Sequence, residues 1–194
     1  MGRPREFDID EALRRAMYAF WAKGYEATSL SDLTNAMGVQ RASLYGTFGD
    51  KHKLFIAALT RYADDGIDRL RTALDRPAAP LDAIRDLFHA MVDNTTAQKG
   101  KRGCFCVNAA VELAPHDPAV SDIVREHVRR MEQVLSVPLE HARAQGALRK
   151  GVDVAQAASY LVSLIFGLHV MSKSGPTRQK LRQVAETGLE FLHA

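Results

Sequence analysis

Residues 28–48 constrain the fold of this chain most, because they read as two short helices joined by a tight turn. Ser29 or Ser31 can cap the first helix, since a side-chain oxygen there accepts a backbone N–H that has no partner within the helix. Gly38 can supply the left-handed backbone that ends it. The apolar residues at helical spacing are Leu30, Leu33 and Met37 in the first helix and Leu44 and Phe48 in the second. The pattern predicts a helix-turn-helix, with a helical hairpin in a buried core as the alternative.

The second helix presents a polar outward face made of Gln40, Arg41, Ser43, Tyr45 and Thr47. A helix-turn-helix places its second helix in the major groove of DNA, with the N-terminal residues at the base edges. Arg41 can donate two hydrogen bonds to guanine, and Gln40 can pair with adenine or bind a phosphate. Ser43 can reach a base edge or a thymine methyl group. Tyr45, Thr28 and Lys51 suit phosphate oxygens, which fix the register without reading sequence. A solvated surface position is the alternative for each residue.

Arg3 and Arg5 lie in a short basic arm before the first helix. Such arms can enter the minor groove, where arginine favours the negative potential of narrow A·T segments, and a solvated tail is the alternative. Residues 1–55 contain eight basic and seven acidic side chains. DNA affinity must therefore come from where the basic groups lie and not from bulk charge.

A longer set of residues carries a family resemblance: Phe20, Trp21, Gly24, Tyr25, Thr28, Gly38, Val39, Ser43, Leu44, Tyr45, Phe48, Asp50, Lys51, Leu54 and Phe55. With this set at a matching spacing, the first third of the chain resembles the TetR family of transcriptional regulators. Gly46 departs from the family pattern, which often has an aromatic residue or His there. The segments 103–108 and 115–118 resemble a subset of the family's ligand domains more weakly. The resemblance implies a DNA-binding domain at 1–50 and a helical effector-binding and dimerisation domain at 51–194.

Hydrophobic periodicity and helix-ending residues predict an all-α chain of about nine helices, and no window reads as a strand. Beyond the helix-turn-helix, helices are expected at about 8–23, 51–75, 81–98, 104–113, 117–145, 153–172 and 177–192.

The composition is ordinary for a globular protein, with 46% hydrophobic and 25% charged residues and a net charge of +3. We find no run of about 18 apolar residues, so we expect no membrane span and no membrane partner. The N-terminus lacks the apolar stretch of a signal peptide, which predicts a cytoplasmic protein with mainly reduced cysteines. The sequence suggests no cofactor.

The helix expected at 153–172 is apolar over more than one face, so it must pack against a core and a second surface. In the family, the last two helices pair with their copies in a second subunit. The resemblance therefore implies a homodimer interface at Ala158, Leu161, Ile165, Leu168, Leu181 and Val184. Closure of the monomer core by the same residues is the alternative. A single helix-turn-helix cannot read a two-fold operator, which favours the dimer.

Aromatic, sulfur-containing and titratable residues on the candidate inward faces predict an effector pocket. They are Phe88, His89, Met91, Phe105, Cys106, Met131, Phe166, His169 and Met171. Apolar pockets with a few polar groups are typical of small-molecule sites, and core packing is the alternative for each residue. The hypothesis is a repressor that leaves a palindromic double-stranded DNA operator when a small-molecule effector binds. We expect the helix at 51–75 to couple the two sites.

Cys104 and Cys106 suggest a second hypothesis, a thiol sensor of oxidants or electrophiles. The pair follows Lys99, Lys101 and Arg102 and lies at an expected helix N-terminus, and both features lower the pKa of a thiol. Positions i and i+2 of a helix point to different faces, so a direct disulfide is not expected. Cys104 is expected to be the reactive thiol and Cys106 to pack inward.

Other readings of the cysteines and of the chain stay open. A metal site would need His89, His116 or a carboxylate in addition to the two thiols, and we predict none. A cysteine-dependent enzyme would need a base beside a thiol, and no phosphate-binding glycine loop is present. A DNA-binding architectural protein without a ligand is the remaining alternative.

Overall fold

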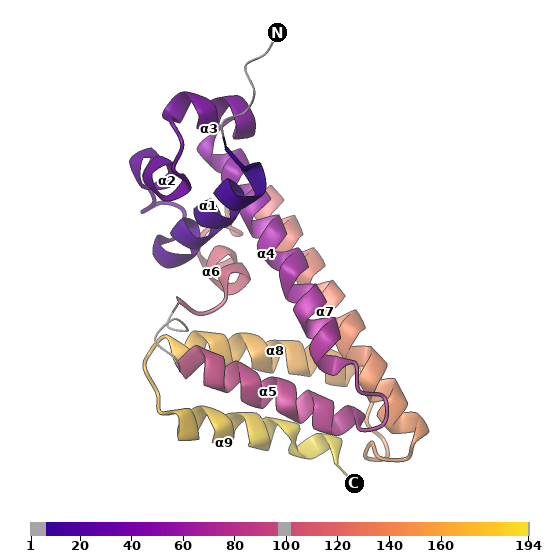
Figure 1. Cartoon of the computed structure of the whole chain (residues 1–194). Coiled ribbons are helices and arrows are strands. Elements are labelled where there is room, and N and C mark those ends of the chain that lie inside the picture. Colours follow the sequence, from indigo (N-terminus) through magenta and orange to yellow (C-terminus); the bar gives the residue numbers. More distant parts are fainter. Residues whose placement is uncertain (1–6, 97–101, 194) are drawn as a thin grey trace.

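The computed structural model describes residues 7–96 and 102–193, which fold into helices joined by short turns (Figure 1). The α-helices in these ranges are α1 (Ile9–Lys23), α2 (Leu30–Met37), α3 (Arg41–Phe48), α4 (Lys51–Leu74), α5 (Pro80–Thr96), α6 (Phe105–Glu112), α7 (Pro118–Ala144), α8 (Val154–Ser172) and α9 (Arg178–Leu189). A short 3-10 helix, η2 (Glu190–Leu192), follows α9. The nine α-helices confirm the all-α prediction, and their ends lie within three residues of the expected ones.

Side chains at the helix N-termini explain why these boundaries could be predicted. Asp8 accepts hydrogen bonds from the backbone N–H groups of Asp10 and Glu11, at 2.9 and 3.2 Å, and so begins α1. Caps of the same kind begin α4 at Asp50, α7 at Asp117, α8 at Asp153 and α9 at Thr177. Each cap pairs a backbone donor that the helix itself leaves without an acceptor.

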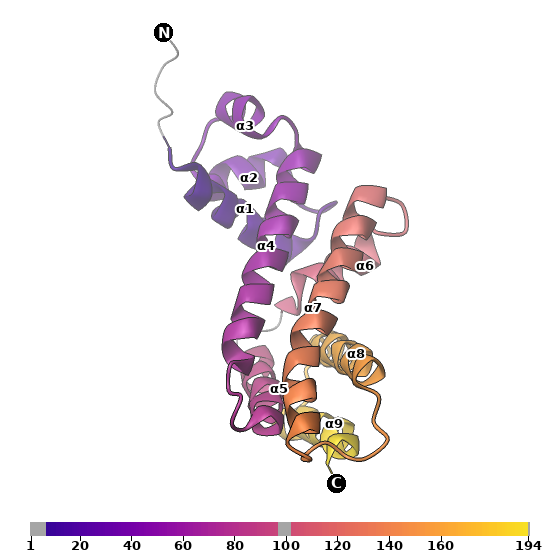
Figure 2. The ribbon, with the colours of Figure 1, turned by 90° about the vertical axis from the view of Figure 1, so that its right-hand side faces the viewer.

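The buried apolar side chains form two clusters. The first cluster joins α1, α2, α3, the first half of α4, α6 and the start of α7, and includes Phe20, Phe55 and Phe105. The second cluster joins the rest of α4 and α7 with α5, α8 and α9, and includes Phe88 and Leu161. The long helices α4 and α7 run side by side and contribute to both clusters (Figures 1 and 2). The hydrophobic core therefore does not divide at residue 50, because α6 packs with the three N-terminal helices.

Helix α8 passes a test of length and composition that bears on the expected absence of a membrane span. By length and composition alone, it is the one helix within the described residues that could cross a membrane, although we expected none. Its residues Val154, Leu161 and Leu168 are buried in the second cluster, and α8 packs against α7 and α9. A helix with several apolar faces is also what the centre of a helical bundle requires.

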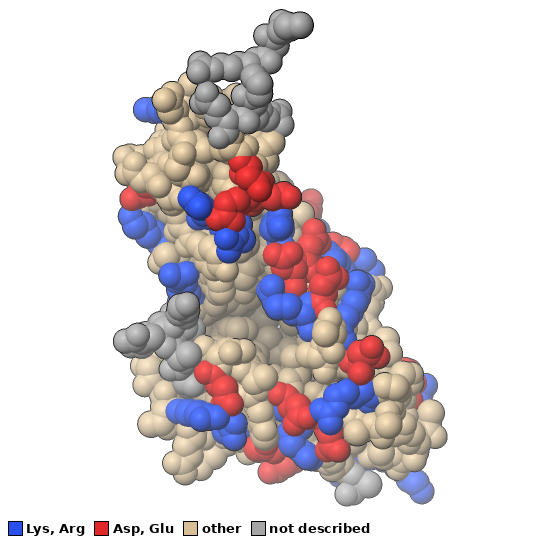
Figure 3. Space-filling view, viewed as in Figure 1, with Lys and Arg blue, Asp and Glu red and all other residues tan. Residues whose placement is uncertain are grey.

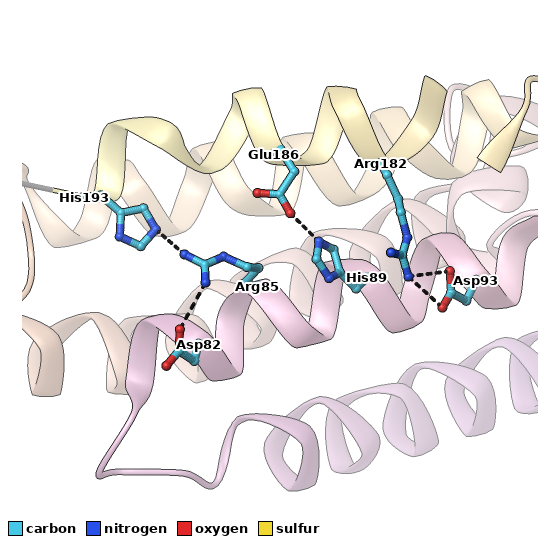
Figure 4. A network of polar contacts seen from close by, with 7 residues as sticks. All are labelled: Asp82, Arg85, His89, Asp93, Arg182, Glu186 and His193. Carbon is cyan, nitrogen blue, oxygen red and sulfur yellow. Dashed lines mark hydrogen bonds and ion pairs between the residues drawn. The ribbon is translucent and has the colours of Figure 1, made fainter. Parts of the chain in front are cut away.

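A polar seam joins α5 to α9 (Figure 4). His89 on α5 contacts the carboxylate of Glu186 on α9, and Asp93 on α5 accepts hydrogen bonds from Arg182 at 3.0 and 3.1 Å. These partners are partly exposed, so each pair adds little to stability. They border the apolar contact between α5 and α9 in the second cluster.

Candidate nucleic-acid interface

The turn between α2 and α3 has the geometry that the sequence predicts. Ser29 caps α2 through a capping box, in which its hydroxyl accepts from the Asp32 N–H at 3.1 Å while its own N–H donates to the Asp32 carboxylate at 2.9 Å. Gly38 ends α2 in the left-handed conformation at φ +70°, where a side chain would be strained. Leu33, Met37 and Leu44 are buried beneath the turn. These contacts hold α3 at a fixed angle to α2.

The outward face of α3 carries three exposed polar residues, Gln40, Arg41 and Tyr45. The Arg41 guanidinium lies 5.6 Å from the centre of the Tyr45 ring, and its Nη2 lies 3.4 Å from the Tyr45 hydroxyl. Arg41 forms no ion pair with any acidic side chain in the described parts of the chain. Ser43 and Thr47 are half-buried at the edge of this face. The face therefore offers a positive charge and hydrogen-bonding groups that no carboxylate neutralises.

The N-terminus of α3 has no side-chain cap. Gln40 occupies the cap position without a side-chain hydrogen bond, and the first turn holds no acidic residue. The N–H groups and the positive end of the helix dipole are thus available to an anion such as a phosphate. α3 lies at the end of the molecule farthest from α5 and α9, with no other helix over its outward face (Figures 1 and 2).

The structure places other predicted DNA contacts differently. Thr28 is buried, and its hydroxyl donates to the Gly24 carbonyl at 2.5 Å, so its assignment as a phosphate contact is wrong for this conformation. The Lys51 ammonium group is half-buried and lies 4.3 Å from the centre of the Tyr25 ring, at the first turn of α4. Arg3 and Arg5 lie outside the described residues.

Sequence analysis missed the role of Glu112, at the C-terminal end of α6. Its two carboxylate oxygens accept the backbone N–H groups of Tyr25 at 3.0 Å and Glu26 at 2.9 Å, in the loop between α1 and α2. Gly24 leaves room for this carboxylate, since a Cβ there would lie 2.8 Å from Glu112 Oε2. We call this contact the Glu112 clamp. Nothing in the local sequence pattern pairs residue 112 with residues 25 and 26.

The other end of α6 also holds the DNA-binding helices. The indole N–H of Trp21 on α1 donates to the Gly103 carbonyl at 3.1 Å, just before α6 begins. The Phe105 ring packs edge-on against Phe55 and Tyr62 of α4, with ring centres 5.4 and 5.6 Å apart. α6 is therefore fixed to α1 and α4 at its N-terminal end and to the loop between α1 and α2 at its C-terminal end.

A further contact joins the start of α4 to the start of α7. His52 Nε2 lies 2.6 Å from a carboxylate oxygen of Asp117, which also caps α7. The hydrogen bond with His52 holds the pKa of Asp117 below its usual value.

The residues predicted to line an effector pocket are divided between the two clusters. Phe105 and Cys106 lie in the first cluster, whereas Phe88, Met91, Met131 and Met171 lie in or against the second. Phe166 packs against both clusters, and His169 on α8 has a buried Nδ1 atom to which no group of the described residues hydrogen-bonds. His89 lies in the polar seam with Glu186, so its assignment to an inward pocket is wrong (Figure 4). Most of this set is therefore core packing, the alternative given above.

The residues predicted to form the dimer interface are mostly inside the monomer. Ala158, Leu161, Ile165, Leu168 and Leu181 are buried in the second cluster, and Val184 is half-buried against it. The predicted interface residues lie on the apolar side of each helix, and that side packs into the core of the monomer. The opposite side of α8 exposes Tyr160, Ser163, Gly167 and Val170.

The structure also corrects the account of the cysteines. Both thiols are buried, and a hydrogen bond joins them. Cys104 precedes α6 in an extended conformation (φ −98°, ψ 133°), so the helical spacing of positions i and i+2 does not apply to this pair. The hydrogen bond from Cys106 lowers the pKa of Cys104 to about 7, with help from N–H groups of the first turn of α6. Arg102 packs over the Tyr18 ring instead, and Lys99 and Lys101 lie outside the described residues. In the described residues, no group of three or more His, Cys, Asp and Glu side chains could hold a metal ion.

A helix-turn-helix with an uncapped, arginine-bearing second helix, joined to a larger helical domain, defines a DNA-binding transcriptional regulator. Residues 12–58 match the family described as bacterial regulatory proteins, tetR family, and residues 80–192 match the family described as tetracyclin repressor-like, C-terminal domain. The chain belongs to the TetR family of transcriptional regulators, as the resemblance implied.

Relatives that match over nearly the whole chain are regulators too. The HTH-type transcriptional repressor ComR of Escherichia coli (strain K12) is 34% identical over 98% of this chain and 91% of its own length. The uncharacterized HTH-type transcriptional regulator YezE of Bacillus subtilis (strain 168) is 32% identical over 99% of this chain and 100% of its own. These matches confirm that the chain is a regulator and not an enzyme.

Among solved structures, a cysteine mutant of the TetR family transcriptional regulator CifR superposes with a TM-score of 0.85. CifR is 34% identical, and the match covers 98% of this chain and 100% of that one. That structure contains a 26 bp double-stranded operator DNA.

Proposed function

We propose that this protein is a homodimeric repressor that acts in the cytoplasm, binds a palindromic operator, and leaves it when a small molecule binds the helical domain. The observation that carries the DNA-binding part is the exposed face of Gln40, Arg41 and Tyr45 on α3, in which Arg41 has no carboxylate partner among residues 7–96 and 102–193. The full-length similarity to the repressor ComR and to CifR, whose solved structure contains operator DNA, supports the same conclusion.

In this proposal, the residues of α3 divide into base readers and phosphate contacts. Arg41 lies in the first turn of α3, where a guanidinium can donate two hydrogen bonds to O6 and N7 of guanine. Gln40 lies beside it at the uncapped helix end, next to N–H groups that suit a phosphate. Tyr45 orients Arg41 through the ring contact and donates to the DNA backbone. Ser43 and Thr47 contribute from the edge of the same face.

The exposed side of α8 is the best candidate for the dimer interface. Tyr160 is 46% exposed and Val170 is 52% exposed, with the small residues Ser163 and Gly167 between them. Large apolar groups that flank small ones allow two helices to approach closely. The exposed residues, rather than Leu161 and Ile165, would then meet the partner subunit.

Effector binding would reach the DNA-binding helices through α6 as well as α4. The Glu112 clamp holds the loop after α1, and the Gly103 carbonyl holds Trp21. A displacement of α6 by a ligand would move both contacts together and change the angle between the two recognition helices of the dimer. The ligand must bind the two conformations with different affinity for this to occur.

Selection from a library of random duplex DNA tests the proposal. The full chain should enrich an inverted repeat whose half-sites lie about one helical turn or a multiple of it apart, bound by two chains. Transcription from a promoter that carries the repeat should fall when the protein is added. Enrichment of no sequence, or of a site without two-fold symmetry bound by one chain, would contradict the proposal.

One observation favours a second candidate, in which the effector is an oxidant. The buried Cys104 and Cys106 thiols share a hydrogen bond, which lowers the pKa of Cys104 to about 7 against the opposing effect of burial. Peroxide would oxidise the pair to a disulfide with loss of two protons and two electrons, and would itself be reduced to water. Loss of operator binding with peroxide in the wild type, but not in Cys104→Ser, tests this candidate.

A further inference from the structure

The basic side chains of the helix-turn-helix are held in two different ways. Within residues 7–55, those that form an ion pair with a carboxylate are Arg14, Arg15, Lys23 and Lys53. Such pairs are common in the molecule, since basic and acidic side chains lie next to one another over much of the face drawn in Figure 3. Arg41 and Lys51 form no ion pair within the described residues, and each lies against a tyrosine ring instead. A ring face attracts a cation without neutralising its charge, so both groups keep a full positive charge.

The closer of these two contacts joins Lys51 to Tyr25, whose ring is fixed in the loop between α1 and α2. The Lys51 ammonium nitrogen lies 4.3 Å from the centre of the Tyr25 ring. That ring packs edge-on against Phe55, with ring centres 5.0 Å apart, and stacks on Phe20 at 6.1 Å. The Tyr25 backbone N–H donates to Glu112 at 3.0 Å, within the Glu112 clamp. A lysine attracted to this fixed ring is confined with it.

The carboxylates around the Tyr25 ring are engaged by other groups. Asp50 caps the N-terminus of α4, and a carboxylate oxygen of Asp117 lies 2.6 Å from His52 Nε2. Burial, together with the charges of the nearby carboxylates, raises the pKa of Tyr25, so its hydroxyl keeps its proton at pH 7. The ring therefore attracts Lys51 through its neutral face and not as a phenolate.

We propose that Tyr25 is a positioning residue for operator binding, because its ring holds the Lys51 ammonium group at the start of α4 where a DNA phosphate can meet it. The inference deepens the proposed operator binding and rests on it. The start of α4 lies beside α3, at the same end of the molecule (Figures 1 and 2). An ammonium group has three N–H donors, so contact with a ring face leaves donors for a phosphate oxygen.

Positioning by the ring lowers the cost of binding. A lysine that is free in solution loses rotamer entropy when it binds, and a side chain that is already confined loses less. Because the Glu112 clamp holds the backbone of Tyr25, a displacement of α6 would move the ring and the lysine together. The same contact thus connects α6 to a contact with the DNA backbone.

A double-mutant cycle tests this role, with binding of the full chain to the selected operator and to a duplex of random sequence measured over a range of KCl concentrations. Lys51→Met should lower by about 1 the slope of the logarithm of the binding constant against the logarithm of the salt concentration, as expected for one lost phosphate contact. Tyr25→Leu should weaken binding by about two- to tenfold in the wild type. It should have no further effect in Lys51→Met.

Two variants and one control separate the ring contact from a general effect on folding. Tyr25→Phe keeps the ring and should bind DNA as the wild type does. Phenylalanines with one, two or three ring fluorines at position 25 keep the packing but weaken the attraction for a cation, so affinity should fall stepwise even if Tyr25→Leu does not fold. Tyr18→Leu removes an exposed tyrosine of α1 that lies under Arg102 instead, and should leave DNA binding unchanged.

The inference is overturned if Tyr25→Leu weakens binding equally with and without Lys51, if fluorination has no effect, or if Lys51→Met leaves the salt slope unchanged. The random duplex separates this result from the proposed function, because a phosphate contact does not depend on sequence. If the cycle behaves as expected there while no inverted repeat is selected, the role of Tyr25 stands and the repressor proposal fails. If a repeat is selected and the cycle fails, the repressor proposal stands without this role.

Discussion

The helix-turn-helix and the helical domain differ in how their functional residues are determined. In the first, Gln40, Arg41 and Tyr45 lie on one face of one short helix, and neighbours in the sequence determine which face that is. In the second, the side chains that matter come from helices that are tens of residues apart. Local periodicity identifies the face of a helix that is apolar, but it does not say whether that face meets the chain's own core or another molecule.

Helix α8 shows what this difference means in practice. Its most apolar side, with Leu161 and Ile165, closes the monomer, whereas its mixed side, with Tyr160 and Val170, remains exposed. An interface between copies of a chain often has a more mixed composition than the core. For an oligomeric helical protein, the side with moderate apolarity is therefore the better candidate for the interface.

The largest expected effect is a loss of stability when a charge is placed on the buried side of α8, in contrast to a loss of dimerisation when it is placed on the exposed side. Leu161→Glu places a carboxylate in the second cluster and should destabilise the monomer by more than about 4 kcal/mol, because the charge has no partner there. Tyr160→Glu, one residue earlier, removes an edge-on ring contact with Phe191 but places its charge at the surface, so it should leave the second cluster intact and dissociate the dimer. Urea denaturation and analytical ultracentrifugation measure the two effects. A well-folded Leu161→Glu variant, or a Tyr160→Glu variant that stays dimeric, would reverse the assignment of the two sides.

The next effect is a dependence of stability on pH between about 4 and 6.5 that two histidines of the helical domain produce. Because the folded pKa values of His127 and His169 are about 4 and the unfolded value is near 6.5, the unfolded chain binds more protons between these limits. The free energy of unfolding should be highest above about pH 6.5. It should fall by up to about 3 kcal/mol per histidine as the pH falls to 4.

Denaturant titrations at a series of pH values, for the wild type and for His127→Leu and His169→Leu, check this dependence. Each variant should show a flatter curve between pH 4 and 6.5. Unchanged slopes in both variants would mean that these imidazoles are not buried as neutral groups.

A smaller effect concerns the contact between the two regions. Glu112→Ala removes the acceptor of two N–H groups and should cost about 2 kcal/mol, with faster amide exchange at Tyr25 and Glu26. Glu126→Ala, which removes an exposed carboxylate on α7, serves as the control. Exchange rates at Tyr25 and Glu26 that stay at the wild-type value in Glu112→Ala would show that the clamp does not hold the loop.

The smallest effect is expected at Thr28. Thr28→Val keeps the shape and removes the hydrogen bond to the Gly24 carbonyl, so it should cost about 1 kcal/mol of stability. The salt dependence of operator binding should not change, because Thr28 does not reach the surface. If the slope of the logarithm of the operator-binding constant against the logarithm of the salt concentration fell by about 1, Thr28 would be a phosphate contact, as the sequence predicts.

Features that depend on contacts within one helix could be predicted from the sequence, and features that depend on contacts between distant segments could not. Ser29, Gly38, Asp50 and Asp117 act within one turn of their own helix, so the sequence alone predicts nearly every helix boundary. The exposed face of α3 is predictable for the same reason.

Contacts between distant segments could not be predicted. Glu112 meets residues 25 and 26, His127 meets Gly66, and the thiol of Cys104, where the chain is extended before α6, meets Cys106. The burial of Thr28 and the position of His89 beside Glu186 also depend on packing across the fold. The spacing of residues within one helix does not show which distant segment that helix contacts.

The most direct test of the account measures base preference at the operator. The selected inverted repeat would be changed one base pair at a time, and the affinity of wild type, Arg41→Ala and the exposed control Lys180→Ala would be measured for each version. The account predicts that wild type and Lys180→Ala discriminate at one position of each half-site by about 1–3 kcal/mol, and that Arg41→Ala loses this discrimination. An Arg41→Ala variant that binds more weakly but keeps the full base preference would contradict the claim that α3 reads the operator through Arg41.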